Sequence, residues 1–225
     1  MIYVPASGPD SWRALLADPE TQWRSGFSAK ALAHCWQESN GFPETVRNVL
    51  DADARFLGAQ MLLGFVEHKV PLRGRGKPSQ TDLFVLAKLA DRSLAAIAVE
   101  GKVAEPFGET VEEWLSAERS PNKMERLQHL VGTLDLDLGL IAPVHYQLLH
   151  RTASALLEAQ RYNAQHAMML VHSFSRTHAR FDDYRAFALM LGATAQPNAI
   201  TTVGERSGIL LHLAWVTGAE RFLTL

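Results

Sequence analysis

The sequence predicts an α/β fold, an α/β sandwich in which a central mixed sheet is flanked by helices. Residues 83–88 and 94–102 are apolar at nearly every position, which is typical of strands that are covered on both faces. The tight turn at residues 90–93 makes these two strands antiparallel neighbours. An apolar strand, a helix and another apolar strand then follow one another between residues 166 and 218, and this order favours a sheet covered by helices.

The first part of the chain is predicted to be helical. Residues 7–43 predict two short helices, the second of which begins at Ser28 and ends at Gly41. From Pro43 onwards, apolar residues recur at helical spacing, which predicts one long helix that ends before Pro71. The residues of this apolar stripe are Val46, Val49, Leu50, Leu57, Met61 and Phe65.

The rest of the chain alternates between helices and strands. A short strand and an exposed loop are expected before residue 81. Residues 108–118 and 120–134 predict two amphipathic helices, and a longer helix is expected to begin near Val144. The last predicted elements are a strand over residues 166–175, a helix over 182–193 and a strand over 208–218.

We expect a single domain over residues 1–225, because no linker divides the chain. Residues 1–42 would form an N-terminal helical extension. Residues 43–175 would form the core, with a helical insertion at about 107–140, and residues 176–225 would complete the sheet with a helix and a strand.

The composition sets limits on the class of protein. The chain has 225 residues, of which 47% are hydrophobic, and this is enough for one sizeable core. We expect no transmembrane helix and no signal peptide, because the sequence has neither a long apolar run nor a charged segment followed by an apolar one. The single cysteine, Cys35, cannot form an internal disulfide and lies in an apolar helical stretch, so we interpret it as a core residue. A cytoplasmic location is therefore expected.

Three charged residues stand at one end of the two apolar strands. Asp82 opens the first strand, and Glu100 and Lys102 close the second. Side chains alternate along a strand, so Glu100 and Lys102 should project from the same face. A turn centred near residue 92 brings residue 82 beside about residue 101, and the carboxylates of Asp82 and Glu100 are therefore expected to converge.

Two converging carboxylates repel each other unless a positive charge lies between them. Lys102 supplies one such charge, and Mg²⁺ or Mn²⁺ would supply the rest, because hard divalent cations take oxygen ligands. A metal-bound water has a lowered pKa, and a nearby lysine can orient it, which is the chemistry of phosphodiester hydrolysis. The alternative is a partly buried salt bridge between Lys102 and one of the carboxylates, and the spacing alone leaves both interpretations open.

The order of the elements and the Asp…Glu-x-Lys pattern resemble the PD-(D/E)XK nuclease superfamily, which has the restriction endonuclease-like fold. Thr81 and Asp82 stand where the superfamily has Pro-Asp, and its Glu-x-Lys is matched by Glu100, Gly101 and Lys102. The core region also resembles an uncharacterised bacterial family close to that superfamily. The resemblance implies Asp82 and Glu100 as metal ligands, with the Gly101 carbonyl as a third. It implies Lys102 as the residue that orients or activates the attacking water.

Other residues are expected to support this site. In the superfamily the helix from Val144 packs beside the metal, so Gln147 or Arg151 would hold a phosphate oxygen or orient Lys102. Pairing with an acidic residue at the helix edge is the alternative for both side chains. Glu44, at the start of the long first helix, would be a further carboxylate at the metal, or would simply favour the positive end of the helix dipole.

A basic loop precedes the first apolar strand. Its cations, which lie among glycines and prolines, are Lys69, Arg73, Arg75 and Lys77. Such a loop can follow a phosphate backbone, and we interpret it as a nucleic-acid contact, with a solvated hairpin as the alternative. The net charge of −2 gives no support to a protein that coats nucleic acid in general. The acidic residues between positions 105 and 118 indicate a solvated helix face, and if they border the site they argue against a simple non-specific nuclease.

The leading interpretation is a Mg²⁺-dependent nuclease whose partner is nucleic acid, with DNA as the first expectation. The rival is a nuclease-fold protein without catalysis that serves as a binding or assembly module, and the net negative charge favours this rival. A zinc hydrolase finds no support, because the nine histidines include no metal-ligand spacing. We expect no membrane partner, and a homodimer is left open.

Overall fold

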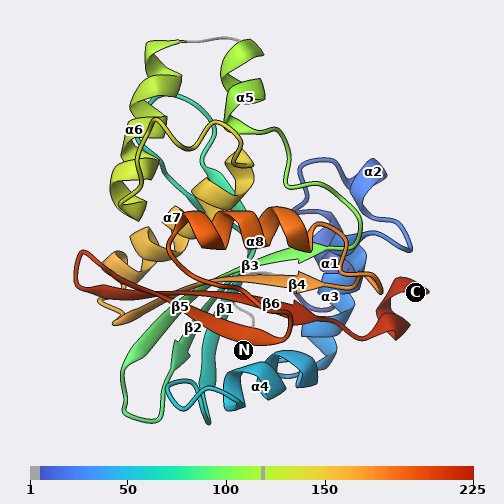
Figure 1. Cartoon of the computed structure of the whole chain (residues 1–225). Helices are drawn as coiled ribbons and strands as arrows, with labels where there is room; N and C mark the ends of the chain where they lie inside the picture. The colour runs from blue at the N-terminus through green and yellow to red at the C-terminus, as the bar shows by residue number, and fades with distance from the viewer. Residues whose placement is uncertain (1–5, 118–119) are drawn as a thin grey trace.

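A computed structural model of the chain describes residues 6–117 and 120–225. At its centre lies a six-stranded sheet in the order β1-β2-β3-β4-β6-β5 (Figure 1). The strands are β1 (Gln60–Val70), β2 (Ser79–Lys88), β3 (Leu94–Lys102), β4 (His166–Ser173), β5 (Ala199–Arg206) and β6 (Ile209–Thr217). β1, β2 and β3 form an antiparallel meander, β4 and β6 run parallel to β3, and β5 is antiparallel to β6. The predicted α/β fold with a mixed sheet is therefore confirmed.

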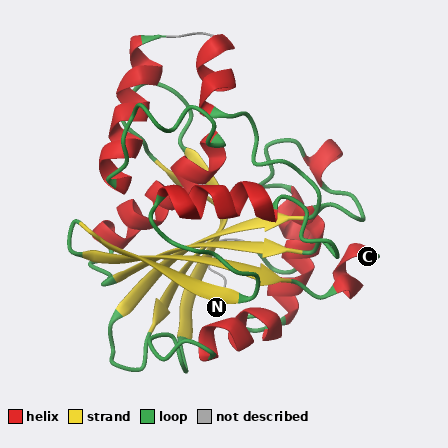
Figure 2. Ribbon diagram, viewed as in Figure 1, coloured by secondary structure: helices red, strands yellow, loops and turns green. Residues whose placement is uncertain are grey.

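Helices cover both faces of this sheet (Figure 2). One face carries α1 (Asp10–Arg13), α2 (Pro19–Gln22), α3 (Ser28–Glu38), α4 (Glu44–Asp51) and the 3-10 helix η1 (Glu220–Leu223). The other face carries α5 (Val111–Ala117), α6 (Pro121–Leu134), α7 (Tyr146–Arg161) and α8 (Phe181–Met190). α3 packs on β3 from one side, and α7 packs on β3 and β4 from the other. The strand that carries Glu100 and Lys102 is therefore covered on both faces.

The side chains of β2 and β3 alternate between two hydrophobic cores. Leu83, Val85 and Val99 lie in the core beneath α3 and α4, whereas Phe84 and Ala98 lie in the core beneath α7. All five are almost fully buried, and burial of a large apolar side chain contributes about 1.5–3 kcal/mol. An unpaired charge in this part of either strand would be very unfavourable. Charged residues are therefore confined to the strand ends, where partners from other elements are within reach.

The expected long helix after residue 43 is wrong. α4 ends at Asp51, and the chain enters β1 after a turn that includes Gly58, whose φ is +71°. Met61 and Phe65, which extended the predicted stripe, lie in β1. They are four residues apart, but the register shift between Met61 and Leu63 places them on opposite faces of the sheet, Met61 against the core beneath α3 and α4 and Phe65 against the core beneath α7. A strand with apolar residues on both faces therefore produced the spacing of a helical stripe.

Two further details separate the structure from the prediction. β5 was not predicted: it is an edge strand, its residues are mostly half-exposed, and it pairs with β6 alone. The helix predicted over residues 108–118 is α5, but Glu118 lies outside the described residues. No helix in the described ranges is both long and apolar enough to cross a membrane.

Gly101 lets α3 approach β3 closely. A methyl group at this position would lie 3.3 Å from Cδ2 of Leu32 and 3.5 Å from Oδ2 of Asp82. The glycine therefore fixes the distance between the helix and the strand end that carries the charged residues.

We expect Gly101→Ala to lower the free energy of unfolding by about 1–3 kcal/mol, because the added methyl group overpacks the contact with Leu32. Gly132→Ala is the matched control. Gly132 lies in α6, a methyl group there would meet nothing within 4 Å, and alanine favours a helix by about 0.5–1 kcal/mol over glycine. Urea unfolding of both variants tests this, and equal stability of Gly101→Ala and the wild type would contradict it.

Candidate functional site

A cavity of about 400 Å³ opens where the ends of β2 and β3 meet α7 and the N-terminal helices. We call it the carboxylate cavity. Its charged lining residues are Glu67, Asp82, Glu100, Lys102, Glu105 and Arg151. Gly101, Gln147 and apolar residues of the N-terminal segment, such as Leu32, complete the wall. The structure therefore brings Asp82, Glu100, Gly101 and Lys102 together at one site.

The strand register sets three carboxylates in a row. The last rung between β2 and β3 joins Leu83 to Val99, so the next residues, Asp82 and Glu100, stand opposite each other. The sequence-based register, which placed residue 82 beside about residue 101, was one residue off. The rungs between β1 and β2 place Glu67 beside Asp82 in the same way. Three neighbouring strands therefore each contribute one carboxylate at the same level of the sheet.

Asp82 replaces a backbone acceptor where the ladder between β2 and β3 ends. Its Oδ2 accepts a hydrogen bond of 2.8 Å from the backbone N–H of Gly101. Its Oδ1 accepts no hydrogen bond from the described residues. The side chain is half-buried, so one carboxylate oxygen is fixed and the other is available to a ligand.

Glu100 is the centre of a buried network of charges. Its Oε1 accepts hydrogen bonds from Nζ of Lys102 at 2.9 Å and from Nε2 of Gln147 at 2.6 Å. Its Oε2 accepts a hydrogen bond of 2.6 Å from Nε of Arg151. The Gln147 side chain also accepts from Lys102 at 3.0 Å. Glu100, Lys102 and Arg151 are all at least nine-tenths buried, so the charges of the network that joins β3 to α7 are largely shielded from bulk water.

The three carboxylates of the row differ in pKa. Burial alone would raise the pKa of Glu100, but the charges of Arg151 and Lys102 outweigh it and lower the pKa to about 2. Burial, together with the negative charge of Glu100, raises the pKa of Asp82 to about 7. Burial and the negative charge of Asp82 raise the pKa of Glu67 to about 8. At neutral pH the row therefore holds one firmly ionised carboxylate and two that resist ionisation.

Behind Arg151 lies a second hydrogen-bonded group. Nη1 of Arg151 donates to Oγ of Ser79 at 3.1 Å, and this oxygen lies 2.9 Å from Nδ1 of His150. Burial and the nearby charge of Arg151 hold the pKa of His150 well below its ordinary value. The imidazole is therefore neutral. Nη1 of Arg151 also lies 3.3 Å from Nδ1, and a guanidinium can only donate, so Nδ1 is assigned as an acceptor and the imidazole proton to Nε2.

The predicted supporting residues divide into two groups. Gln147 and Arg151 reach Glu100 from α7 and bond to its carboxylate. This matches the alternative given for these two side chains, pairing with an acidic residue. Glu44 does not reach this cavity: it is exposed at the start of α4 and lines a different depression. The reason is that α4 packs against β5 and β6, which lie at the opposite edge of the sheet from β1 and β2.

Of the predicted basic loop, Lys69 lies in β1, and the other three cations lie between β1 and β2, where α6 holds the chain. The side chains of Lys69, Arg73, Arg75 and Lys77 are exposed. Nη1 of Arg126 donates to the carbonyl of Lys77 at 2.7 Å, and the backbone at Gly74 and Gly76 lies directly against Arg126. The loop therefore keeps a fixed position only a few residues along β2 from Asp82.

Glu67 is the one carboxylate of the row that the sequence interpretation missed. The predicted long helix covered its neighbourhood, so no strand partner for Asp82 was sought there. In the structure its φ is +51°, and its Oε2 accepts a hydrogen bond of 2.7 Å from Nε2 of Gln80. An acid placed three residues before the end of an alternating strand was the signal that could have identified it.

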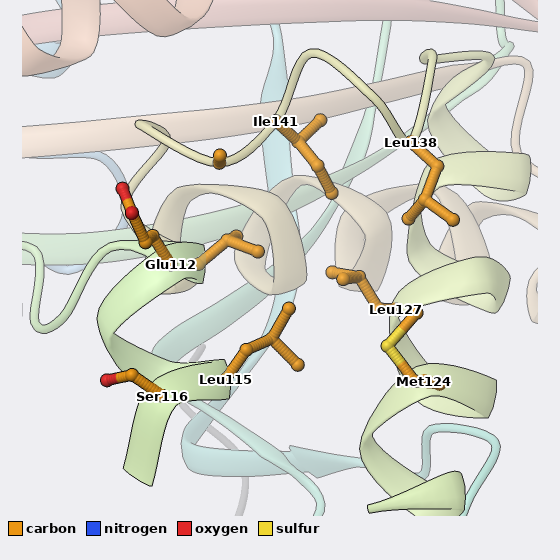
Figure 3. A pocket seen from close by; sticks show the side chains of 9 residues that line it. Glu112, Leu115, Ser116, Met124, Leu127, Leu138 and Ile141 are labelled. Atoms are coloured by element: carbon orange, nitrogen blue, oxygen red, sulfur yellow. The ribbon is translucent and has the colours of Figure 1, made fainter. Parts of the chain in front are cut away.

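A second cavity, of about 520 Å³, lies between α5 and α6 (Figure 3). Leu115, Met124, Leu127 and Ile141 point into it, and Glu112 is its one acidic lining residue. It shares no residue with the carboxylate cavity. Its lining offers no pair of groups for acid–base or metal chemistry, so the carboxylate cavity is the better candidate for a functional site.

In the described ranges, no three acidic, histidine or cysteine side chains are grouped closely enough to hold a metal ion as they stand. The hydrogen bonds of Glu100 explain this, because they turn its carboxylate toward α7. A metal at this site would therefore require the side chains of Glu67 and Asp82 to turn toward the remaining lone pair of Glu100.

We expect the metal-free protein to lose stability as the pH rises through about 7 to 8, because Asp82 and Glu67 must then ionise in a buried row. In the unfolded chain these groups ionise near their ordinary pKa values of 3.8 and 4.5. The stability they contribute is therefore complete only below these ordinary values, and its loss is complete once the pH has passed the folded-state values of about 7 and about 8. Glu67→Gln should therefore melt at a higher temperature than the wild type near pH 9, but not near pH 5.

Melting curves in EDTA between pH 5 and pH 9 test this expectation. Glu112→Gln is the control, because Glu112 is exposed on α5. The same pH profile for wild type and Glu67→Gln would contradict the assignment of a strained carboxylate row.

Comparison with known proteins gives one positive finding. No match was found among the curated proteins or among the solved structures. A family model described as a domain of unknown function, DUF6946, matches residues 5–220, which is nearly the whole chain. The chain therefore belongs to the DUF6946 family.

Proposed function

We propose that this protein is a Mg²⁺-dependent nuclease that hydrolyses phosphodiester bonds in nucleic acid, with DNA as the first candidate. The observation that carries the proposal is the presence of Asp82, Glu100 and Lys102 in one cavity, with Glu67 beside them. Adjacent carboxylates can hold a divalent cation, and a lysine next to them can orient water and neutralise developing charge. Mn²⁺ would serve in place of Mg²⁺.

The order of elements supports a restriction endonuclease-like fold. The chain runs from α4 through the β1-β2-β3 meander to α7, and then to β4, which is parallel to β3. PD-(D/E)XK nucleases, which this chain resembles, have a helix, a three-stranded meander, a helix and a fourth strand in the same order. α5 and α6 would then be an insertion before the second core helix.

The donor set fits a hard divalent cation. With every group ionised, the carboxylate cavity holds four carboxylates against the two cations Lys102 and Arg151, which leaves two excess negative charges. Oδ1 of Asp82 accepts no hydrogen bond from the described residues, and Oε2 of Glu100 accepts one. Both oxygens therefore keep lone pairs for a cation, and Mg²⁺ is commonly held by one or two carboxylates together with water.

Each residue of the site then has a distinct role. Asp82 and Glu100 would hold the cation, with the Gly101 carbonyl and Glu67 as further oxygen donors. When bound, the cation would polarise a phosphoryl oxygen and lower the pKa of a bound water. Lys102 would orient the attacking water and stabilise the charge that develops on the phosphate. Gln147 and Arg151 hold Glu100 and Lys102 in place, and the exposed cations of the basic loop would contact neighbouring phosphates.

A second candidate function is a binding or assembly module without catalysis. The closed network around Glu100 favours it, because two cations and the Gln147 amide already pair with this carboxylate without any metal. A buried ion network of this kind can serve the fold alone. The two functions differ in their response to a divalent cation and to loss of the Lys102 ammonium group.

The first test is thermal. We expect Mg²⁺ or Mn²⁺ to raise the melting temperature of the wild type, because a ligand that binds only the folded state stabilises it. Asp82→Asn should abolish this rise, since the amide can still accept from Gly101 but no longer attracts a cation. Asp91→Asn, in the turn after β2, is the matched control and should keep the rise. A melting temperature that does not respond to either metal in the wild type would favour the binding module.

The second test is enzymatic. We expect Lys102→Met to bind the metal but to lose on the order of a hundredfold or more in cleavage rate, because no group then orients the water. Lys88→Met, at the exposed opposite end of β2, is the control. The assay uses single- and double-stranded DNA and RNA with Mn²⁺. Cleavage that persists in Lys102→Met would contradict the assigned role of this residue.

The basic loop is tested by binding measurements on the same nucleic acids at several salt concentrations. Arg73→Ala combined with Arg75→Ala should weaken binding of every nucleic acid and flatten its salt dependence, because fewer phosphates are then neutralised. An unchanged salt dependence would remove the loop from the proposed interface.

A further inference from the structure

A third cavity, of about 340 Å³, lies next to the carboxylate cavity. Lys102 and Gln147 line both cavities, so these two side chains form the wall between them. The other lining residues are Pro106, Phe107, Gly108, Glu109, Trp114, Tyr146 and His150. Four of them carry a ring with delocalised electrons, and we call this the aromatic cavity.

The aromatic side chains are held firmly in place. The rings of Trp114 and Tyr146 are stacked, with centroids 4.2 Å apart and planes only 9° apart. Phe107 is fully buried, and Nζ of Lys102 lies 5.0 Å from the centre of its ring. Tyr146 and His150 lie one turn apart on α7 and face the same cavity. Such a rigid aromatic wall is suited to a flat ring, because little side-chain freedom is lost when the ring binds.

The polar groups of the aromatic cavity suit a ring that forms hydrogen bonds. The Nε2–H of His150 has no partner among the described residues, since Nδ1 alone contacts Ser79 and Arg151. Glu109 offers a carboxylate acceptor at the rim. Besides Lys102 and Gln147 in the shared wall, the cavity therefore presents a donor in His150 and an acceptor in Glu109, and the negative charge of Glu109 disfavours a phosphate at the rim.

We propose that the aromatic cavity binds an unpaired base next to the phosphodiester that is cleaved, so that the substrate is single-stranded or locally unpaired nucleic acid. The inference rests on the proposed nuclease function. A phosphate beside Lys102 and a ring on the other side of the same side chain are the two parts of one nucleotide. A base can enter a cavity only after it leaves the stack and its pair, which costs least in a single strand.

The test is equilibrium binding in EDTA, where no cleavage occurs. The probes are a short single-stranded oligonucleotide, as DNA and as RNA, and the matching duplex. We expect Trp114→Ala to weaken binding of the single strand by about five- to a hundredfold, which is the range for loss of one base–aromatic stack. Binding of the duplex should not change. Trp23→Ala is the matched control, because Trp23 is also half-buried but lies at the end of α2, outside the aromatic cavity.

A second measurement uses the wild type alone, in case Trp114→Ala does not fold. The fluorescent base 2-aminopurine is moved through the single strand one position at a time, and we expect strong quenching at one position. Equal quenching at all positions, or unchanged single-strand binding by a folded Trp114→Ala, would overturn the proposal.

The outcomes separate this proposal from the proposed function. Single-strand binding that depends on Trp114, without cleavage in Mn²⁺, would keep the base site and reject the nuclease. Cleavage of duplex with no effect of Trp114→Ala would keep the nuclease and reject the base site. Failure to bind any nucleic acid would reject both.

Discussion

The buried carboxylate of Glu100 is the interaction on which the arrangement of this site depends. It lies at the end of a strand whose other residues are apolar and covered on both faces, so its charge cannot be left to water. Arg151 and Gln147 from α7 and Lys102 from its own strand compensate it. Because these partners come from different elements, the charge fixes how α7 sits on β3. The same contacts set the wall between the carboxylate cavity and the aromatic cavity.

The neighbours of Glu100 show how unequal the electrostatic compensation is. Arg151 and Lys102 act mainly on Glu100, and the next carboxylates in the row, Asp82 and Glu67, receive less of their charge. A network built only for stability would more simply use apolar residues at these two positions, because half-buried carboxylates without a cationic partner of their own reduce stability. Asp82 and Glu67, the two members of the row with less compensation, are therefore the part of the site that a purely structural role explains least well. Oδ1 of Asp82 also accepts no hydrogen bond from the described residues.

Much of this arrangement could be predicted from the sequence, and the failures have physical causes. The alternation in β2 and β3 and the tight turn between them were sufficient to bring Asp82, Glu100 and Lys102 together. The first part of β1 was mistaken for a helix because it carries apolar residues on both faces at helical spacing, and Glu67 was not assigned to the site as a result. β5 was hidden because an edge strand with one neighbour needs no continuous apolar pattern. The contacts of Glu100 with α7 depend on helix packing, which no local pattern specifies.

The position of Lys102 connects the chemistry of the two cavities. Its ammonium group bonds to Glu100 and Gln147 on one side and lies over the ring of Phe107 on the other. A lysine held only for charge balance needs no aromatic partner, and a lysine exposed to water would be mobile. Here three contacts from β3, α7 and the segment after β3 hold the charge in one place, which is the condition for acting on a reacting group rather than screening it. Because Lys102 lines both cavities, a ligand in either one lies next to the same ammonium group.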